Sequence, residues 1–288
     1  MLIENQNSLP YLTTSQKINL LCDIAKKGLN TCYNLLESNS NSGRDKNGFN
    51  MVENTRYKII AQIGIEKWNR IHPEQKNSLP DLWPYIIQDY YQINSAGNLG
   101  LALWAAAIKN SDAAKLFLTK LVTQWHNLKL DCNAVELAWA LKGLSTIHYK
   151  EKLNRQAQQV MNDAYNTLKG LYNPDTCLFA KHSRKGISAA VSRNIACFAD
   201  QIYPILALAD YSRYFHNQSA CKMALNVAEK ICSLQGPNGQ WWWHYNIKNA
   251  MISEEYPVFS VHQDSMAPMA LFSVDRVAST DHSKFVKK

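Results

Sequence analysis

His262, Gln263 and Asp264 form the densest group of side chains in this sequence that could do chemistry. A histidine beside a carboxylate can move protons near neutral pH, because the imidazole titrates in that range. The group follows an extended stretch and precedes an apolar helix start, so helix capping by Asp264 is the competing structural explanation. We predict that His262 and Asp264 are catalytic residues and that Gln263 contacts the ligand.

A second candidate pair, Asp200 and Gln201, lies about two turns into an apolar run that predicts a helix over 189–215. A carboxylate among apolar side chains needs a charged partner or a raised pKa. Arg193 lies on the same predicted helix face and could be that partner, in which case a structural ion pair would explain both charges. We predict that Asp200 is catalytic and that Arg193 and Gln201 bind the ligand.

Glu254 and Glu255 follow the tryptophan run and stand in a predicted loop. Paired acids are the groups that hydrolyse glycosidic bonds, one as an acid and one as a base or nucleophile. Adjacent acids in a loop can equally be solvated charges without a chemical role. We predict that Glu254 and Glu255 are further candidates for the catalytic acid or base.

Other polar and aromatic side chains stand near the starts of predicted helices or beside the tryptophan run at 241–243. Planar rings can stack on sugar faces, and carboxylates and amides can bind sugar hydroxyls. Polar residues at helix starts also serve as caps, and tryptophans also fill cores, so each has a structural alternative. The remaining predicted ligand-binding residues are Arg56, Tyr57, Glu136, Trp242, Trp243 and His244.

The elements that must position these residues are predicted to be helices, because apolar residues recur at helical spacing and alternating runs are nearly absent. The segment 15–36, for example, carries Ile18, Leu21, Ala25 and Leu29 on one face. The predicted helices cover residues 15–36, 53–69, 98–109, 111–127, 133–148, 151–170, 189–215, 218–234 and 263–278.

Gln235, Gly239 and Trp241 have the spacing Gln-x-x-x-Gly-x-Trp at the end of a predicted helix. This spacing resembles the QW repeat of squalene-cyclase and prenyltransferase-like α/α-toroid proteins. In that family the Gln caps a helix end, the Gly makes the turn and the Trp packs over the next hairpin. The resemblance implies that helical hairpins are arranged in a ring.

Similar polar turns, each followed by an aromatic residue, end three predicted helices at 42–49, 172–179 and 235–241. The last two are about 65 residues apart, the length of one helical hairpin with its loops. Hairpins that bury their faces against their neighbours are typical of a solenoid or toroid. The turn at 172–179 also resembles the Asn-Pro-x-Thr-Gly-Leu-Phe turn of six-hairpin glycosidase-like proteins, with Cys177 in place of the glycine.

Composition excludes several classes of protein. The chain has 288 residues, is 46% hydrophobic and 19% charged, and contains no apolar run near the roughly 20 residues that span a bilayer. Its net charge of +8 is spread along the chain, so we predict no nucleic-acid partner. The N-terminus carries no secretory pattern, and seven unpaired cysteines favour free, mostly buried thiols in a reducing compartment. We therefore predict a cytoplasmic protein.

Motifs for other chemistries are absent, including Asp-x-Asp-Asp, Asp-Asp-x-x-Asp, Gly-x-Ser-x-Gly, Cys-x-x-Cys and a glycine-rich phosphate loop. Asp175 and Cys177 do match the Asp-x-Cys zinc pair of protein prenyltransferase β subunits, with His244 or His262 as a later ligand. They lie, however, inside a turn that has its own structural explanation. We therefore predict neither a metal site nor a cofactor.

Together these observations predict an all-α protein of helical hairpins arranged as an α/α toroid, in a single domain over residues 1–288. The last hairpin, from about residue 261, is incomplete, so the predicted ring is open or the chain is truncated. The predicted function is a carbohydrate-active hydrolase, lyase or epimerase whose partner is a sugar or glycan. One alternative is an isoprenoid-processing or isoprenoid-binding protein with a deep apolar cavity. The other is a non-catalytic helical-repeat interaction protein.

A toroid gathers the starts of its inner helices at one end. We therefore predict that one pocket, about 10 Å across, is lined by residues from four separate segments. These residues are Arg56 or Tyr57, Asp200, Trp242 or Trp243, and His262 with Asp264.

Overall fold

The computed structural model describes residues 13–39, 54–76, 78–182, 194–258 and 261–287. The chain folds into two compact units, Met1–Leu82 and Trp83–Lys288. The described residues are mostly helical, as predicted. None of their helices combines the length and the apolar character that crossing a membrane requires. The single domain over the whole chain stays a prediction.

The first unit contains two long helices, α1 (Thr14–Asn39) and α2 (Thr55–Ile71), followed by the short turn η2 (Pro73–Gln75). The side chain of Asn54 caps α2 by accepting a hydrogen bond from the backbone nitrogen of Arg56. Within α2, Gln62 is fully buried and accepts a hydrogen bond from the backbone nitrogen of Leu82 at 2.8 Å. This bond connects the helix to the end of the unit.

The second unit contains most of the helices and all of the described strands. Its helices and helical turns are α3 (Trp83–Gln88), η3 (Asp89–Gln92), α4 (Ala96–Lys109), α5 (Ala114–Leu128), η4 (Lys129–Asp131), α6 (Ala134–Lys150), α7 (Arg155–Lys169), α9 (Phe198–Phe215), α10 (Gln218–Ser233), η5 (His262–Met266), α11 (Ala267–Ala278) and α12 (Ser283–Val286). Its strands are β1 (Tyr172–Asn173), β2 (Leu178–Phe179), β3 (Ile195–Cys197), β4 (Trp242–Asn246) and β5 (Ile252–Pro257).

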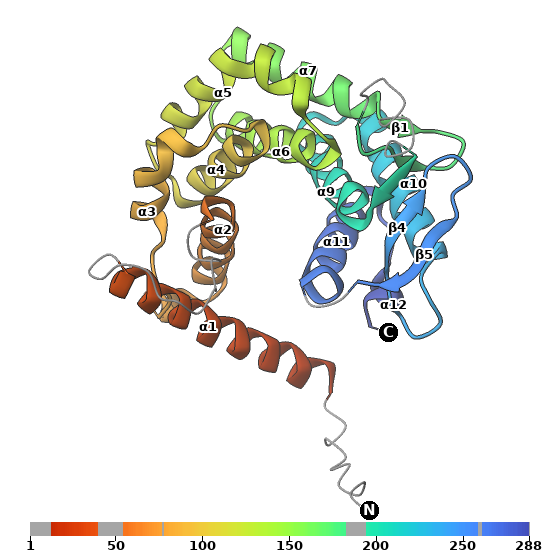
Figure 1. Cartoon of the computed structure of the whole chain (residues 1–288), viewed down its shortest axis with the longest axis horizontal. Coiled ribbons are helices and arrows are strands. Elements are labelled where there is room, and N and C mark those ends of the chain that lie inside the picture. The colour runs from red at the N-terminus through yellow and green to blue at the C-terminus, as the bar shows by residue number, and fades with distance from the viewer. Residues whose placement is uncertain (1–12, 40–53, 77, 183–193, 259–260, 288) are drawn as a thin grey trace, which may run out of the picture. The chain divides into compact units, whose positions relative to one another are not determined.

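The long helices of this unit form two rows (Figure 1). In one row α4 packs on α6, α6 on α9, and α9 on α11. In the other row α5, α7 and α10 each pack on the helix that precedes them in the chain. We call the first row the inner row, and we call the side of it that faces away from α5, α7 and α10 the inner side. Two of the inner helices, α6 and α9, are largely buried, because an inner helix on each side and an outer helix cover them.

Glycines allow the closest helix contact in the unit, between α4 and α6. A Cβ atom on Gly143 would collide with the backbone carbonyl of Gly100, and a Cβ atom on Gly100 would collide with the backbone of Trp139 and Ala140. Only residues without a side chain permit this approach. The contact fixes the spacing of the first two inner helices.

Asparagine and serine side chains set the starts of the helices. Ser95, Asn133, Asn154 and Asn217 each accept a hydrogen bond from a backbone nitrogen in the first turn of α4, α6, α7 and α10, respectively. The predicted helices therefore agree with the observed ones to within a few residues, except at α9. That helix begins at Phe198 and not at 189, because residues 195–197 pair as strand β3.

A three-stranded antiparallel sheet in the order β3-β4-β5 is the feature that periodicity does not predict. In its register Cys197 pairs with His244, and His244 pairs with Glu254. The prediction that Glu254 and Glu255 lie in a loop is therefore wrong, since both belong to β5. Cross-strand pairing stabilises these strands, and a run such as Trp-Trp-His-Tyr carries no alternation that would reveal it.

Two glutamines make the same contact in successive hairpins. The side chain of Gln201 both donates to and accepts from the backbone of Phe179, 22 positions earlier. The side chain of Gln263 accepts from the backbone nitrogen of Trp241, also 22 positions earlier, and donates to the carbonyl of Gly239. Phe179 and Trp241 end the two similar turns that the sequence predicts as a repeat, so this part of the repeat is present in the structure.

Candidate functional site

Asp200 lies in the first turn of α9, where its side chain is 1% exposed. Its carboxylate accepts a hydrogen bond from the backbone nitrogen of Cys197 at 2.9 Å and forms a capping box with that residue. Burial raises the pKa of Asp200, and the hydrogen bonds from Cys197 and the charges of Lys181 and His182 oppose this rise. The sequence predicts Asp200 about two turns into its helix, and this is wrong because α9 begins at Phe198 and not at 189.

Gln201 and Gln263 use their side-chain amides to hold backbone. Gln201 is fully buried, and its oxygen and nitrogen contact the nitrogen and oxygen of Phe179 at 2.8 and 2.9 Å. Gln263 holds Trp241 and Gly239 in the same manner. These contacts position the turns before α9 and α11, so both glutamines support the candidate site as structural residues.

The three consecutive tryptophans have three different environments. Trp241 is 1% exposed and packs against Phe198 with ring centroids 5.9 Å apart. Trp242 is 7% exposed, and its indole nitrogen donates to the carbonyl of Leu234 at 2.8 Å. Trp243 is half-buried. Of the three, Trp243 is the least buried.

His262 and Trp243 meet at the start of the last inner helix. Their ring centroids are 4.6 Å apart in an edge-on arrangement, and His262 is half-buried. Asp264 follows two residues later in the π-helical turn η5 and is exposed. A strand and a helix start thus bring together an aromatic ring and an imidazole, and a carboxylate follows two residues later in the chain.

Strand β4 also carries His244, whose Nδ1 lies 3.2 Å from the carboxylate of Glu254 on β5. Both side chains are exposed, so the pair gains little free energy from its charges. Glu255, the next residue on β5, is exposed too. The sheet therefore presents one histidine and two carboxylates to solvent.

Glu136 lies at the start of α6, where its backbone nitrogen binds the Asn133 cap at 2.9 Å. A Cβ atom on Gly97 would lie 2.9 Å from its side chain, so Glu136 covers the start of α4. Nearby in sequence, Trp139 packs edge-on against Tyr203 of α9, with centroids 4.9 Å apart. Aromatic and acidic groups therefore accompany the starts of three inner helices.

Three other predicted residues cannot be placed relative to this group. Arg56 and Tyr57 lie in the first turn of α2, in the other compact unit. Arg193 lies outside the described residues. The common pocket that would include all of these residues stays a prediction.

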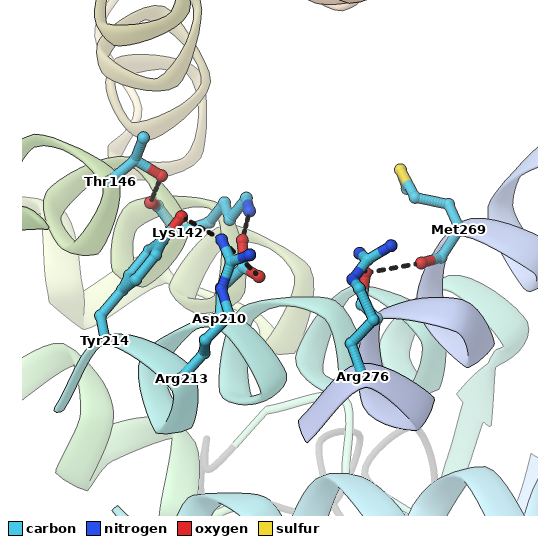
Figure 2. A network of polar contacts seen from close by, with 8 residues as sticks. Lys142, Thr146, Asp210, Arg213, Tyr214, Met269 and Arg276 are labelled. Carbon is cyan, nitrogen blue, oxygen red and sulfur yellow. Dashed lines mark hydrogen bonds and ion pairs between the residues drawn. The ribbon is translucent and has the colours of Figure 1, made fainter. Parts of the chain in front are cut away.

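Further along the inner helices lies an ionic cluster that the sequence analysis did not single out (Figure 2). Lys142 of α6 forms a buried ion pair with Asp210 of α9, and the Lys142 ammonium lies 4.6 Å from the ring of Trp104. Arg213 approaches Asp210 from the next turn at 3.7 Å. A signal existed for this cluster, since Lys142 and Asp210 are lone charges within otherwise apolar helical runs.

The remaining chemistry-bearing groups do not form a metal or thiol site. In the part of the chain that the structure describes, no three His, Cys, Asp or Glu residues are grouped to hold a metal ion. All seven cysteines are free, although only Cys132 and Cys232 are fully buried. Burial raises the pKa of Cys132, Cys197 and Cys232 to about 12, so these thiols are poor nucleophiles.

A cavity of about 450 Å³ lies between the α4–α5 and α6–α7 connections. Lys115, Lys150, Lys152, Asp112 and Glu151 are among its lining residues, and no predicted site residue lines it. Lys150 is held there by the carbonyl of Ala107 and the side chain of Asn110. The cavity is thus separate from the group around Trp243.

No protein-family model, no curated protein and no solved structure matches this chain.

Proposed function

We propose that the protein is a carbohydrate-active protein of the α/α-toroid type that binds a sugar or glycan where β4 meets the start of α11. The observation that carries the proposal is the contact between Trp243 and His262 at the start of the segment that also holds the exposed Asp264. A half-buried indole can stack on the apolar face of a sugar ring. An imidazole and a carboxylate from the same helix start can bind its hydroxyl groups and move a proton.

The row of inner helices supports the toroid arrangement. Each inner helix packs on the next, and outer helices return the chain, which is how successive hairpins of a toroid are placed. In this proposal the second unit is an open array whose inner helices begin at one end. The turns held by Gln201 and Gln263 are then repeats of one hairpin connection.

The inner side argues against the isoprenoid alternative. An isoprenoid pocket needs a deep apolar lining, whereas the buried Lys142–Asp210 pair and the exposed Arg213 place charged groups on the inner helices (Figure 2). Covering Arg213 with an apolar ligand would remove its charge from water, which costs roughly several kcal/mol. A polar and aromatic lining suits a polyhydroxylated ligand better.

The described carboxylates favour proton transfer by His262 and Asp264 over hydrolysis by a pair of acids. Asp200 is buried and holds the start of α9. Glu254 is occupied with His244 on the exposed sheet. The reaction class proposed is therefore a lyase or epimerase, in which a histidine or carboxylate removes a proton from the sugar.

The first test is a binding titration with defined neutral and acidic oligosaccharides by isothermal calorimetry. Loss of a stacking ring is expected to weaken binding by about tenfold or more in the Trp243→Ala variant. Trp68→Ala is the matched control, because Trp68 is also half-buried but lies in the other unit. Equal affinities in the wild type and in Trp243→Ala would refute the proposed site.

The second test separates binding from turnover. Asp264→Asn and His262→Gln should abolish conversion of a bound oligosaccharide, followed by proton NMR, while the dissociation constant changes little. Glu229→Gln, an exposed acid on α10, is the control and should retain full turnover. Wild-type turnover in Asp264→Asn would remove Asp264 from the mechanism.

A further inference from the structure

Two arginines project from the inner side of the second unit at the far end of neighbouring helices. Arg213 lies in the last turn of α9 and Arg276 in the last turn of α11. The two helices pack against one another, and both side chains point toward the same side of the unit (Figure 2). Both residues are exposed on this side.

The positive charge here exceeds the negative charge. Lys142 and Asp210 neutralise one another as a buried pair, and the side chain of Asp210 is only 9% exposed. Arg213 lies 3.7 Å from the same carboxylate, which is beyond hydrogen-bonding distance. Arg276 donates to the hydroxyl of Ser273 at 3.0 Å, and within the described residues no carboxylate forms an ion pair with it.

The other acids of the inner helices are engaged elsewhere. Asp275 of α11 accepts hydrogen bonds from Thr280 and from the backbone of His282. Asp200 and Glu136 lie at the opposite ends of their helices. The two guanidinium groups therefore keep donors available for a partner outside the chain.

Interaction with the helix dipole is the competing explanation, since cations are favoured in the last turn of a helix. The helix dipole accounts for one arginine in the last turn of each helix. The dipole does not account for the hydrogen bonds that orient each guanidinium. Arg213 donates to the hydroxyl of Tyr214 at 2.8 Å, and Ser273, the acceptor of Arg276, donates in turn to the carbonyl of Met269. Such contacts preorganise a planar fork that matches an oxyanion.

We propose that Arg213 and Arg276 bind the anionic group of an acidic oligosaccharide, a carboxylate or a sulfate. This proposal rests on the proposed function, because the same ligand occupies Trp243 and His262 at the start of α11. With a rise of about 1.5 Å per residue, the helical path from Asp264 to Arg276 is about 18 Å long. A monosaccharide cannot span that distance, so the ligand has several sugar units.

The experiment compares tetragalacturonate with a neutral galactose tetramer of equal length, using isothermal calorimetry at constant ionic strength. We expect the acidic tetramer to bind at least about tenfold more tightly, the size expected for hydrogen bonds to a charged group. Arg276→Gln and Arg213→Gln should abolish this preference and leave the affinity for the neutral tetramer unchanged. Arg276→Lys should restore only part of it, because an ammonium cannot form the bidentate contact.

Arg155→Gln is the matched control, because Arg155 is an exposed arginine at the start of the outer helix α7. It removes the same charge and should keep the preference for the acidic tetramer. Thermal unfolding of every variant checks that the fold is retained. Tight binding of the neutral tetramer with no acidic preference would overturn the arginine site alone. Failure of both tetramers to bind would overturn the proposed function as well.

Discussion

At the scale of single residues, Asp200 shows how burial changes the meaning of a carboxylate. The sequence marks it as unusual because it stands in an apolar run, and the structure shows why it is tolerated. Its carboxylate accepts a hydrogen bond from the backbone nitrogen of Cys197 and so completes the capping box at the start of α9. The residue that the sequence suggests for catalysis therefore has a sufficient structural role.

Asp200 also predicts a pH dependence of stability. Because the pKa of the folded state is raised, the native state holds the proton more readily than the unfolded chain, whose reference value is 3.8. The contribution of Asp200 to the free energy of unfolding is then largest below pH 3.8 and is lost as pH rises through the folded-state pKa. Asp200→Asn keeps the acceptor oxygen without a charge. It should be at least as stable as wild type at pH 7.5, with the difference diminishing toward pH 4.

Urea denaturation at pH 7.5, 5 and 4 measures this difference. Asp200→Ala is the control, because it removes the acceptor as well as the charge and should be about 1 kcal/mol less stable than Asp200→Asn at every pH. A wild type clearly more stable than Asp200→Asn at pH 7.5 would mean that the ionised carboxylate is stabilising. Its interaction with Lys181 and His182 would then outweigh the cost of burial.

At the scale of elements, helices are predictable from this sequence and strands are not. Helical periodicity and Asn or Ser caps act over a few residues, so α4, α6, α7 and α10 begin close to the predicted positions. In the sheet β3-β4-β5, β3 pairs with β4 from about 50 residues earlier, β4 and β5 form a local hairpin, and none of the three strands alternates. The error at the start of α9 comes from the long-range pairing of β3, and the error at Glu254 comes from the missing alternation in β4 and β5.

The close approach of α4 and α6 predicts a large effect of a single methyl group. Gly143→Ala should destabilise the second unit by about 1–3 kcal/mol or more, because the new Cβ would overlap the backbone of Gly100 and neither backbone can move alone. Gly64→Ala is the matched control. Nothing lies within 4 Å of its Cβ position in α2, so helix propensity should stabilise it by up to about 1 kcal/mol.

Thermal and urea unfolding of both variants, followed by circular dichroism, gives the comparison. The sign of the two effects is the decisive result, since both replace glycine by alanine within a helix. If Gly143→Ala is as stable as wild type, the packing of α4 on α6 described here is wrong.

The glutamine contacts predict a second effect at this scale. Gln201→Leu keeps the approximate volume but leaves the backbone nitrogen and oxygen of Phe179 buried without partners. Each such group costs about 1–3 kcal/mol, so the loss should exceed that of an ordinary surface substitution. Gln218→Leu, at the exposed start of α10, is the control and should change stability by less than about 0.5 kcal/mol. Denaturant unfolding measures both, and equal effects would contradict the proposed role of Gln201.

At the scale of the whole molecule, the candidate site divides into a predictable part and an unpredictable part. His262 and Asp264 could be found because their types and spacing are local. The contact of His262 with Trp243 and the pairing of Lys142 with Asp210 connect segments that meet only through the packing of hairpins. A single sequence carries no information on which lone charges in apolar runs will meet.

That pairing gives the last prediction. Lys142→Met and Asp210→Leu each leave one charge buried, and each should cost about 3 kcal/mol or more. The double variant replaces both charges by apolar groups and should cost less than the two single variants together, with a coupling of about 1–3 kcal/mol. Arg213 moderates the loss in Lys142→Met, because it is a remaining cation close to Asp210.

Lys129→Met is the control for this cycle. Its pair with Asp163 is about one-third exposed and should contribute less than about 1 kcal/mol. Urea denaturation of all four variants completes the cycle. Strict additivity of Lys142→Met and Asp210→Leu would show that the two side chains act independently, and α6 and α9 would then be joined by apolar packing alone.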